Sequence, residues 1–252
     1  VSFQSDATNL VPGDTNGFRD VFVTEIATGL IELVTVSTAG EIAVGGQCFN
    51  NDITFDGSLV VFASAATNLV EGHNGVVHIY LRDRTAGTTT VMSTTESGEL
   101  SSGSSGSNSI SDDGTHVAFR TSGGLVDEDT NNANDAYRRR VADGALEIVS
   151  RSALDGSPIG DAVWTGLNGD GSLVVFQSAS PFLVPFDQNG IADVFARPMP
   201  VPTPGDLDFN GDVDAADLAI LLGAWGTGGA DLNGDGITDA ADLAILLGAW
   251  TS

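Results

Sequence analysis

The sequence contains no lysine, one cysteine and three histidines, and its formal net charge is −25 with a pI near 4.1. All nine basic residues are arginines. A chain this acidic repels the phosphates of nucleic acids and the surface of anionic membranes, so we expect no nucleic-acid partner. The apolar runs are far shorter than the roughly 20 residues that a transmembrane helix needs, so we also expect no membrane span.

Residue types that usually carry catalysis are scarce. Cys48 has no second cysteine for an internal disulfide, and we interpret it as a small buried hydrophobe rather than a catalytic thiol. His73 and His78 lie five positions apart without a third ligand, so we interpret them as surface-loop residues rather than a metal site. The chain has no Gly-x-Ser-x-Gly and no His-Glu-x-x-His motif. We therefore predict no catalytic site in this chain.

Length and composition allow one large domain or two smaller ones, because 252 residues with 41% hydrophobic residues can build a real core. The chain opens with valine, and residues 1–5 read as the inside of a β-strand. We interpret this N-terminus as the edge of a fragment, so a missing signal peptide says nothing about secretion.

Two near-identical twelve-residue segments, 206–217 and 231–242, lie near the C-terminus. Each has oxygen-bearing side chains at positions 1, 3, 5, 9 and 12 and glycine at position 6, and position 7 supplies a backbone carbonyl. This is the spacing with which a chain wraps a calcium ion. We therefore predict two calcium ions, one held by Asp206, Asp208, Asn210, Asp212, Asp214 and Asp217, the other by Asp231, Asn233, Asp235, Ile237, Asp239 and Asp242.

The same apolar phrase comes after both loops. Its large residues fall at i, i+3, i+4 and i+7, the period of an amphipathic helix: Leu218, Leu221, Leu222 and Trp225, then Leu243, Leu246, Leu247 and Trp250. Neither stripe can be buried alone, so we predict that the two helices pack together. A flexible acidic tail is disfavoured, because such a tail has no reason to repeat an apolar helix after each loop.

The segments before the two loops, 202–205 and 226–230, are rich in proline and glycine and predict no helix. Loop followed by helix, duplicated and with Asp at position 12, resembles a type I dockerin over residues 206–252. The resemblance implies a pseudo-twofold pair of calcium loops that docks onto a cohesin-type partner. In that family, loop positions 10 and 11 touch the partner, which here implies Ala215, Ala216, Ala240 and Ala241.

This C-terminal segment departs from the dockerin pattern in one respect. Many dockerins carry basic residues on the recognition helix, and residues 205–252 contain no Lys, Arg or His. Attachment to another cell-envelope component therefore stays open beside cohesin binding.

The first 197 residues contain a repeat whose copies are 57 to 59 residues apart. A shared phenylalanine marks one strand, at Phe3, Phe62, Phe119 and Phe176. A second landmark begins at Asp20, His78, Asp135 and Asp193, and a third closes the unit at 34–37, 91–93 and 148–150. Asp-Gly turn pairs at 56–57, 113–114 and 170–171 predict hairpins. Each unit reads as four short antiparallel strands, so we predict a mainly β fold of β-propeller blades.

Segments 50–64 and 193–195 resemble TolB-type propeller repeats, and the resemblance covers residues 1–197. It implies ligands or partner proteins at the central channel or the rim, usually without catalysis. We count two whole blades, a first blade without its opening strand and a last one without its closing strand. The prediction is thus a partial ring of about four blades.

An acidic pattern, Asp-x-Asn-x-x-x-Asp, recurs in one loop of the blades, as Asp14/Asn16/Asp20, Asp129/Asn131/Asp135 and Asp187/Asn189/Asp193. Weak calcium binding is one hypothesis. Asx turns that cap the loop backbone are the favoured one, because repetition at one blade position favours a role in the fold. Arg138–Arg140 lie on a predicted strand, and we interpret them as solvated or paired with local Asp residues rather than as an anion site.

Residues 198–205 hold four prolines and predict a stiff linker between the β region and the calcium module. We therefore predict a non-catalytic, extracellular or surface-displayed protein whose propeller offers a binding surface and whose C-terminal module tethers it. The alternative is an accessory part of a secreted polysaccharide-degrading hydrolase with its catalytic domain upstream of residue 1.

Overall fold

The computed structural model describes residues 1–200, 203–208, 212–233 and 235–251. The chain divides into two compact units, Val1–Met199 and Pro200–Ser252, hereafter the β unit and the helical unit. The division falls inside the predicted linker 198–205. Within the described ranges, neither helix has the length and apolarity that crossing a membrane requires.

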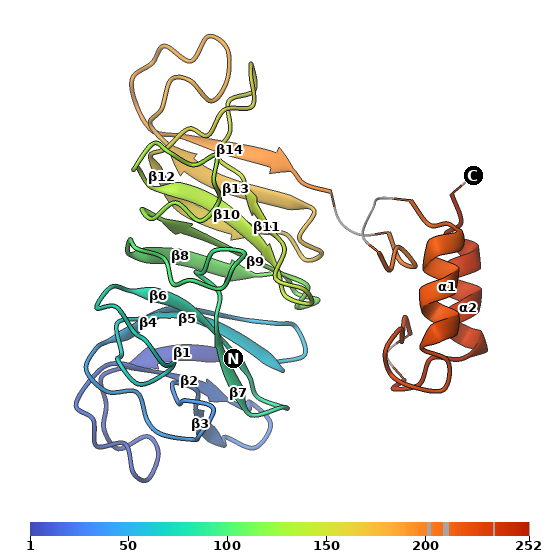
Figure 1. The fold of residues 1–252 in the computed structure, drawn as a ribbon. Helices are drawn as coiled ribbons and strands as arrows, with labels where there is room; N and C mark the ends of the chain where they lie inside the picture. The colour runs from blue at the N-terminus through green and yellow to red at the C-terminus, as the bar shows by residue number, and fades with distance from the viewer. Residues whose placement is uncertain (201–202, 209–211, 234, 252) are drawn as a thin grey trace. The chain divides into compact units, whose positions relative to one another are not determined.

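The β unit consists of four antiparallel sheets that succeed one another along the chain (Figure 1). The first sheet is β1 (Ser2–Ser5), β2 (Asp20–Thr24) and β3 (Ile31–Leu33). The second is β4 (Cys48–Ile53), β5 (Leu59–Ser64), β6 (His78–Asp83) and β7 (Thr88–Val91). The third is β8 (Ser105–Ile110), β9 (His116–Thr121), β10 (Asp135–Arg140) and β11 (Leu146–Ile148). The fourth is β12 (Ala162–Leu167), β13 (Leu173–Ser178) and β14 (Asp193–Pro198).

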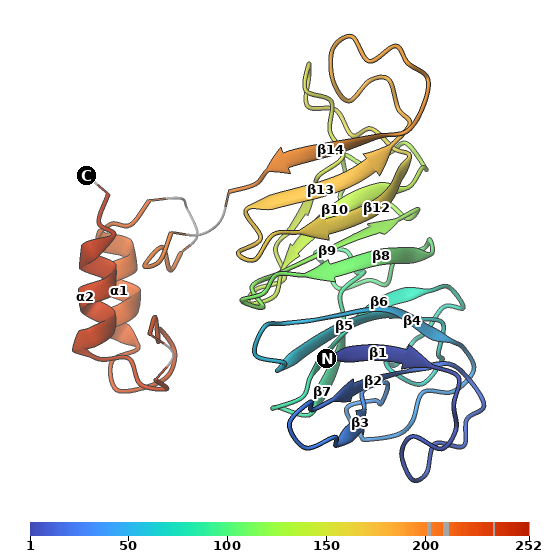
Figure 2. The same ribbon diagram turned by 180° about the vertical axis from the view of Figure 1, so that it is seen from behind.

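The strand count of each sheet agrees with the repeat. The two middle sheets have four strands, whereas the first begins with the strand that carries the shared phenylalanine and the fourth ends one strand early. Figures 1 and 2 show the first and fourth sheets at opposite ends of the β unit. In the part of the chain that the structure describes, the sheets therefore form an open array and not a closed ring.

Two details of the repeat differ from the prediction. The closing landmark of the first unit is shifted, because β3 already ends at Leu33. The position that Ser93 and Ser150 occupy in the later units is therefore taken by Thr35 and not by Ser37. In the Asp-Gly pairs, only the glycine adopts left-handed backbone, as Gly57 does with φ +77°. The Asp56 side chain instead accepts hydrogen bonds from the backbone N–H and the hydroxyl of Ser58. A five-residue loop leaves only one position that needs positive φ.

Stacked aromatic pairs form the centres of the sheets. Phe3–Phe22, Phe62–Tyr80, Phe119–Tyr137 and Phe176–Phe195 have ring centroids 5.6 to 5.9 Å apart. These residues lie directly opposite each other on neighbouring strands, where side chains on one face of a sheet touch. From the second sheet on, each pair packs against aliphatic side chains of the preceding sheet.

Cys48 lies in this core, fully buried at the start of β4, with its Sγ 3.1 Å from the Ser64 hydroxyl oxygen. Burial raises the pKa of its thiol to about 12. A thiol that stays protonated is a poor nucleophile, so the interpretation of Cys48 as a buried small residue is confirmed.

The helical unit contains α1 (Ala215–Gly223) and α2 (Ala240–Gly248), which pack around Leu221 and Leu246. The prediction that the two helices pack together is confirmed, but the predicted apolar stripes are only partly buried. Leu222 and Leu247 are each 52% exposed, and Trp225 lies beyond the end of α1. Trp250 likewise lies beyond the end of α2, so helical periodicity sets the orientation of neither tryptophan.

A substitution tests the inter-sheet packing. Replacing the fully buried Phe119 with Ala removes the ring between the second and third sheets, and we expect a loss of about 3–5 kcal/mol in the unfolding free energy of the β unit. Denaturant unfolding followed by the β-sheet circular dichroism signal measures this loss. Phe55, 92% exposed, is the control: Phe55→Ala should change stability by no more than about 0.5 kcal/mol. Equal losses in both variants would contradict the assignment of the core.

Candidate metal centre

Both predicted calcium loops end in a capped helix. Asp214 at loop position 9 is the N-cap of α1, and its side chain accepts from the Ala216 backbone N–H at 2.7 Å. Asp217 at position 12 completes a capping box by accepting from the Asp214 N–H. Asp239 and Asp242 repeat this arrangement at the start of α2. Carboxylates in the first turn accept hydrogen bonds from the unpaired backbone N–H groups and interact favourably with the positive end of the helix dipole.

The position-12 carboxylate of the first loop is also the centre of its loop. Asp217 is fully buried, and one of its oxygens accepts from the Leu207 and Asp208 backbone N–H groups at 2.6 and 3.0 Å. Burial alone would raise the pKa of this carboxyl, but three backbone N–H donors hold the pKa below its usual range. Asp217 is thus anionic at neutral pH.

Three acidic side chains of this loop converge. Asp206, Asp208 and Asp217 each bring one carboxylate oxygen within 4.8 Å of the other two. They occupy loop positions 1, 3 and 12, the positions that the sequence predicted as ligands. Asp212, at position 7, and Asp214 lie in the same loop, whereas the predicted ligand Asn210 falls outside the described residues.

The second loop is held by the same contacts. Asp242 is fully buried, and its oxygens accept from Asp239 N–H at 2.7 Å and from Leu232 and Asn233 N–H at 2.7 and 3.1 Å. The Asp239 N–H first, then the other two, lower the pKa of this carboxyl. Asp231 accepts from the Asp235 and Gly236 N–H groups at 3.2 and 2.6 Å.

The tight turn at position 6 has the predicted cause. Gly236 has φ +93°, a conformation that residues with a Cβ resist, and the Asp235 side chain accepts from the N–H of Ile237 on its far side. The chain therefore turns directly after the predicted ligands Asp231, Asn233 and Asp235.

The two halves of the helical unit are tied by a contact that the sequence did not lead us to expect. Position 8 of the first loop, Val213, accepts from the Thr251 backbone N–H after α2 at 2.9 Å, and the Val213 N–H donates to the Thr251 hydroxyl at 2.7 Å. Position 8 of the second loop, Thr238, pairs with Gly226 and Thr227 after α1. The signal was present, because positions 213 and 226 recur as 238 and 251 at the same 25-residue shift. The unit is therefore built as two equivalent halves.

The donor set fits a hard cation. Every predicted side-chain ligand in the described residues offers oxygen, and the three converging carboxylates bring concentrated negative charge. Calcium accepts six to eight oxygens in flexible geometry, while magnesium demands a near-ideal octahedron with retained water. A carboxylate has about four lone-pair sites, and Asp217 accepts two hydrogen bonds on one oxygen and one on the other, so the second oxygen keeps a site for a metal bond.

The four alanines predicted to touch a partner are exposed. Ala215 and Ala216 form the first turn of α1, and Ala240 and Ala241 form the first turn of α2. Their exposure is compatible with the predicted role, and their contact with a partner stays a prediction.

The acidic loops of the blades form Asx turns. Asn16, Asn131 and Asn189 each accept, through the side-chain carbonyl, from the backbone N–H two residues on, at 2.7 to 2.9 Å. Asn16 and Asn189 also donate to the carboxylates of Asp20 and Asp193. These contacts support the role in the fold that the repetition favoured, while weak calcium binding there stays a prediction.

A buried acid–hydroxyl pair completes the first and third blades. Asp20 accepts from the Thr35 hydroxyl at 2.6 Å, and Asp135 accepts from Ser150 at 2.7 Å. In the second sheet, His78 takes the acid's place between Ser93 and the Asn74 side chain. His78 is fully buried at the start of β6, so its interpretation as a surface-loop residue was wrong. Both of its ring nitrogens are engaged in hydrogen bonds, so neither is available to a metal ion.

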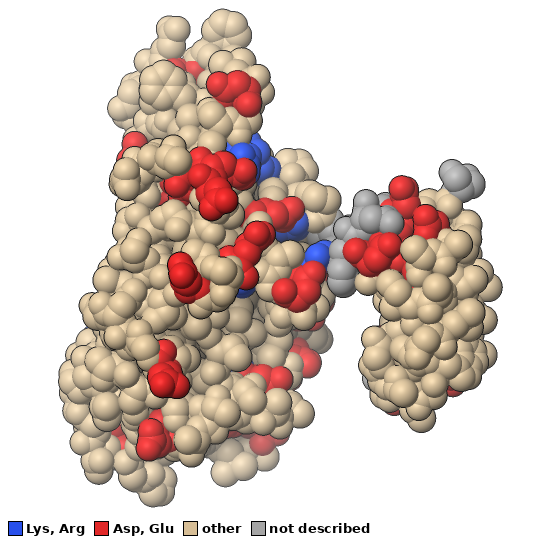
Figure 3. Space-filling view, in the orientation of Figure 1, with Lys and Arg blue, Asp and Glu red and all other residues tan. Residues whose placement is uncertain are grey.

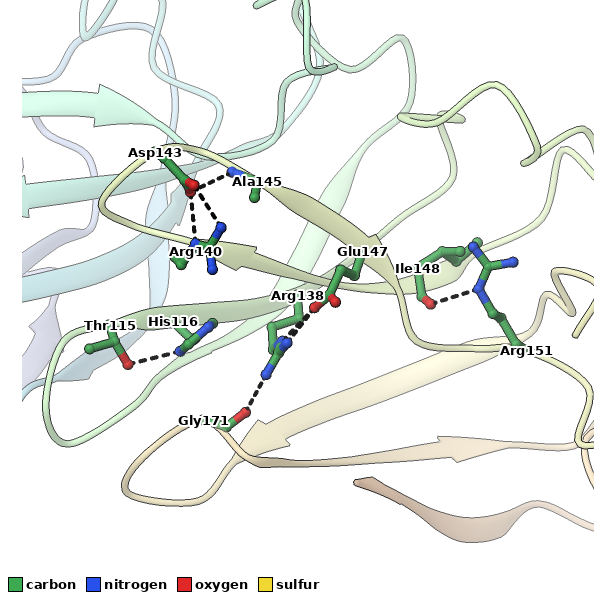
Figure 4. Close-up of polar contacts among 10 residues, drawn as sticks. All are labelled: Thr115, His116, Arg138, Arg140, Asp143, Ala145, Glu147, Ile148, Arg151 and Gly171. Atoms are coloured by element: carbon green, nitrogen blue, oxygen red, sulfur yellow. Dashed lines mark hydrogen bonds and ion pairs between the residues drawn. The ribbon is translucent and has the colours of Figure 1, made fainter. Parts of the chain in front are cut away.

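The arginine cluster joins neighbouring sheets. Arg138 is 3% exposed, pairs with Glu147 at 2.8 Å and donates to the Gly171 carbonyl of the fourth sheet at 2.8 Å (Figure 4). Arg140 pairs with Asp143 at 2.7 Å, and Arg139 donates to the Thr94 carbonyl. The interpretation as charges paired with local Asp residues is confirmed for Arg140, whereas Arg138 pairs with Glu147 and the buried Arg139 donates to the Gly144 and Thr94 carbonyls. The face shown in Figure 3 carries more acidic than basic side chains.

Comparison with known proteins adds structural likeness only. No protein-family model and no curated protein matches the chain. TolB from Acinetobacter baumannii has 17% identity and a TM-score of 0.44, over 74% of this chain and 36% of TolB. The tricorn protease has 16% identity and a TM-score of 0.44, over 75% of this chain and 17% of the protease. The β-propeller domain of the Trilobed protease from Pyrococcus furiosus has 9% identity and a TM-score of 0.37, over 53% and 34%.

The chain thus spans between 17% and 36% of the length of these three proteins. Propellers are among the structures that resemble the β unit, in keeping with its antiparallel sheets of three and four strands. So distant a likeness assigns no activity, substrate or partner.

A buried histidine beside Arg138 predicts a pH dependence. Burial first, and then the positive charge of Arg138, lower the pKa of His116 to about 4. An unfolded histidine titrates near about 6.5, so the unfolded chain binds this proton first as the pH falls. The stability of the β unit should therefore be fully present above about pH 6.5 and decline toward pH 4. In denaturant unfolding across this window, His116→Gln should show a shallower decline than the unsubstituted protein, and identical slopes would contradict the prediction.

Proposed function

We propose that the helical unit is a calcium-dependent docking module that tethers the β unit to a cohesin-type or cell-envelope partner. The single observation that supports this most is the convergence of Asp206, Asp208 and Asp217 at loop positions 1, 3 and 12. A second loop of the same construction and a matching pair of helix starts accompany it. The resemblance to type I dockerins implies one function for these features, which is calcium-dependent docking.

In this proposal the ions hold the module together. Asp206, Asp208, Asp214 and Asp217 would hold one ion and their counterparts in the second loop the other, with backbone carbonyls at position 7. Calcium supplies the charge neutralisation that the acidic loops cannot supply themselves. Among the described residues of this unit, the buried apolar core is Val213, Leu221, Ala230 and Leu246 with a few partly buried neighbours, which is too small to stabilise the unit alone.

The β unit is the cargo in this proposal. We infer a TolB-like, non-catalytic propeller region that offers a binding surface, outside the cell or on its surface. Among the described residues, the buried nucleophile Cys48 has a raised pKa, and the acids of the blade loops take part in turns and buried hydroxyl pairs. A display or binding role thus fits this region better than hydrolysis.

Calcium binding is the first test. Titration calorimetry of the full chain should register two ions in the helical unit. Replacing Asp231 and Asp242 with Ala should abolish one site and leave the other. Chelation should remove the helical circular dichroism signal and leave the sheet signal, because the ions contribute folding free energy to one unit only. Two ions bound at full affinity in the double variant, or helices that persist under chelation, would contradict the proposal.

Partner binding is the second test. A panel of type I cohesin domains and a bacterial cell-envelope fraction, each immobilised, should retain the protein in calcium and release it under chelation. Because the two halves are equivalent, replacing Ala215 and Ala216 with Arg should leave binding through the other half. Replacing all four alanines should abolish it while both calcium ions still bind. Retention of the fourfold variant would show that these surfaces are not the contact.

A further inference from the structure

Two blades of the β unit contain a pair of acids at equivalent loop positions that are withdrawn from solvent. In the first blade the pair is Asp14, which is 5% exposed, and Asp20, which is fully buried. In the third blade it is Asp129, which is partly buried, and Asp135, which is fully buried. Removing a carboxylate from water is costly unless hydrogen-bond donors or a positive charge compensate it. Each pair therefore needs partners.

The first-blade pair has too few of them. Asp20 accepts from the Thr35 hydroxyl and the Asn16 amide at 2.6 and 2.7 Å. Asp14 has a buried oxygen, Oδ1, without a hydrogen-bond donor. None of the ion pairs in the described chain involves either acid. Burial raises the pKa of Asp20, the two donors lower it, and the negative charge of Asp14 raises it again. The two carboxylates thus lie close enough to repel each other.

The third-blade pair has the same deficiency. One oxygen of Asp135 accepts from the Ser150 hydroxyl, and the other, Oδ2, is buried without a hydrogen-bond donor. Asp129 accepts from the Tyr137 hydroxyl. Burial first, and then the negative charge of Asp129, raise the pKa of Asp135 to about 6 against the opposing effect of Ser150. Asp135 is therefore still mostly ionised at neutral pH, and its buried oxygen carries charge that no donor compensates.

The second blade shows that the fold does not require these acids. Both are lost together there, to Gly72 and His78. His78 fills the buried position with both ring nitrogens in hydrogen bonds. Burial first, and then the charge of His73, lower the pKa of His78 to about 4, so its ring is neutral at neutral pH. A blade can thus be built without two charges at this place. The loop asparagines serve the fold through their Asx turns, whereas the paired acids need another explanation.

We propose that the pair Asp14 and Asp20 and the pair Asp129 and Asp135 each bind one calcium ion. A divalent cation compensates both carboxylates of a pair, and it gives the unpartnered oxygens, Oδ1 of Asp14 and Oδ2 of Asp135, a ligand. Carboxylate oxygens are the hard ligands that calcium prefers. The other coordination positions fall to water or backbone oxygens. We therefore expect dissociation constants of about 10⁻⁴–10⁻³ M, the range of extracellular calcium modules.

The proposal goes beyond calcium-dependent docking, because it involves no residue of the helical unit. It also distinguishes between copies of one motif. In the fourth blade, Asp187 and Asp193 are only partly buried, so water reaches both carboxylates, and Asn189 donates to Asp193 at 2.8 Å. These acids need no ion, and the fourth-blade loop is the matched control.

Calcium titration calorimetry tests the proposal on the full chain after both helical loops have been disabled. The disabling substitutions are Asp206→Ala, Asp217→Ala, Asp231→Ala and Asp242→Ala. We expect this loop-disabled protein to bind two calcium ions. Asp14→Asn and Asp129→Asn should each remove one of them, because the amide keeps the shape of the side chain but not its charge. Asp187→Asn should leave both. No calcium uptake by the loop-disabled protein, or two ions still bound when Asp14→Asn and Asp129→Asn are combined, would overturn the proposal.

Stability distinguishes a metal site from a role in the fold. Calcium that binds only the folded β unit should raise the denaturant midpoint of the β-sheet circular dichroism signal in the loop-disabled protein. The combined Asp14→Asn and Asp129→Asn variant should lose this response. In chelator it should be at least as stable as its parent, because the repulsion within each pair is gone. Lower stability in chelator together with an unchanged calcium response would show that the acids serve the fold alone. Because the helical loops are disabled in every arm, failure here and failure of calcium-dependent docking are separate results.

Discussion

The packing of a stacked aromatic pair against the aliphatic side of the preceding sheet holds the β unit together. Each sheet of three or four short strands buries apolar side chains against its neighbours and gains stability from them. Such an array behaves as a one-dimensional chain of coupled units. Burial of apolar side chains supplies most of the interaction energy between sheets. Polar contacts across the sheet boundaries, such as the Arg138 hydrogen bond to the Gly171 carbonyl, help to orient the sheets relative to each other.

The helical unit obeys a different rule. Its apolar core is small, and a few carboxylates connect its loops to its helix starts. Asp217 and Asp242 each connect three backbone N–H groups from two ends of a loop. The same side chains are predicted metal ligands, so the contacts that shape the loop and those that hold the ion share atoms.

Much of this organisation was readable from the sequence because both units are repeats. The 57- to 59-residue spacing predicted the four sheets and their missing strands, and the 25-residue spacing predicted two loop-helix halves. The errors arose where local geometry departs from pattern. Helical periodicity placed Trp225 on a stripe, but α1 ends at Gly223. The closing landmark pointed to Ser37, but the buried hydroxyl partner of Asp20 is Thr35, because the pairing of β2 with β3 sets the register. Val194 is 76% exposed, whereas Val21, Ile79 and Ala136 at the same repeat position are fully buried, and no local motif distinguishes these positions.

The capping boxes of α1 and α2 bear on how fast the helical unit assembles. Starting a helix is the costly step, because several backbone dihedral angles are fixed before many hydrogen bonds form. Here four consecutive residues at each helix start, from Asp214 and from Asp239, contain the donors and acceptors of that first turn. The nucleus of each helix is therefore encoded next to its own loop, and neither half has to find a distant segment of chain before its first turn can form.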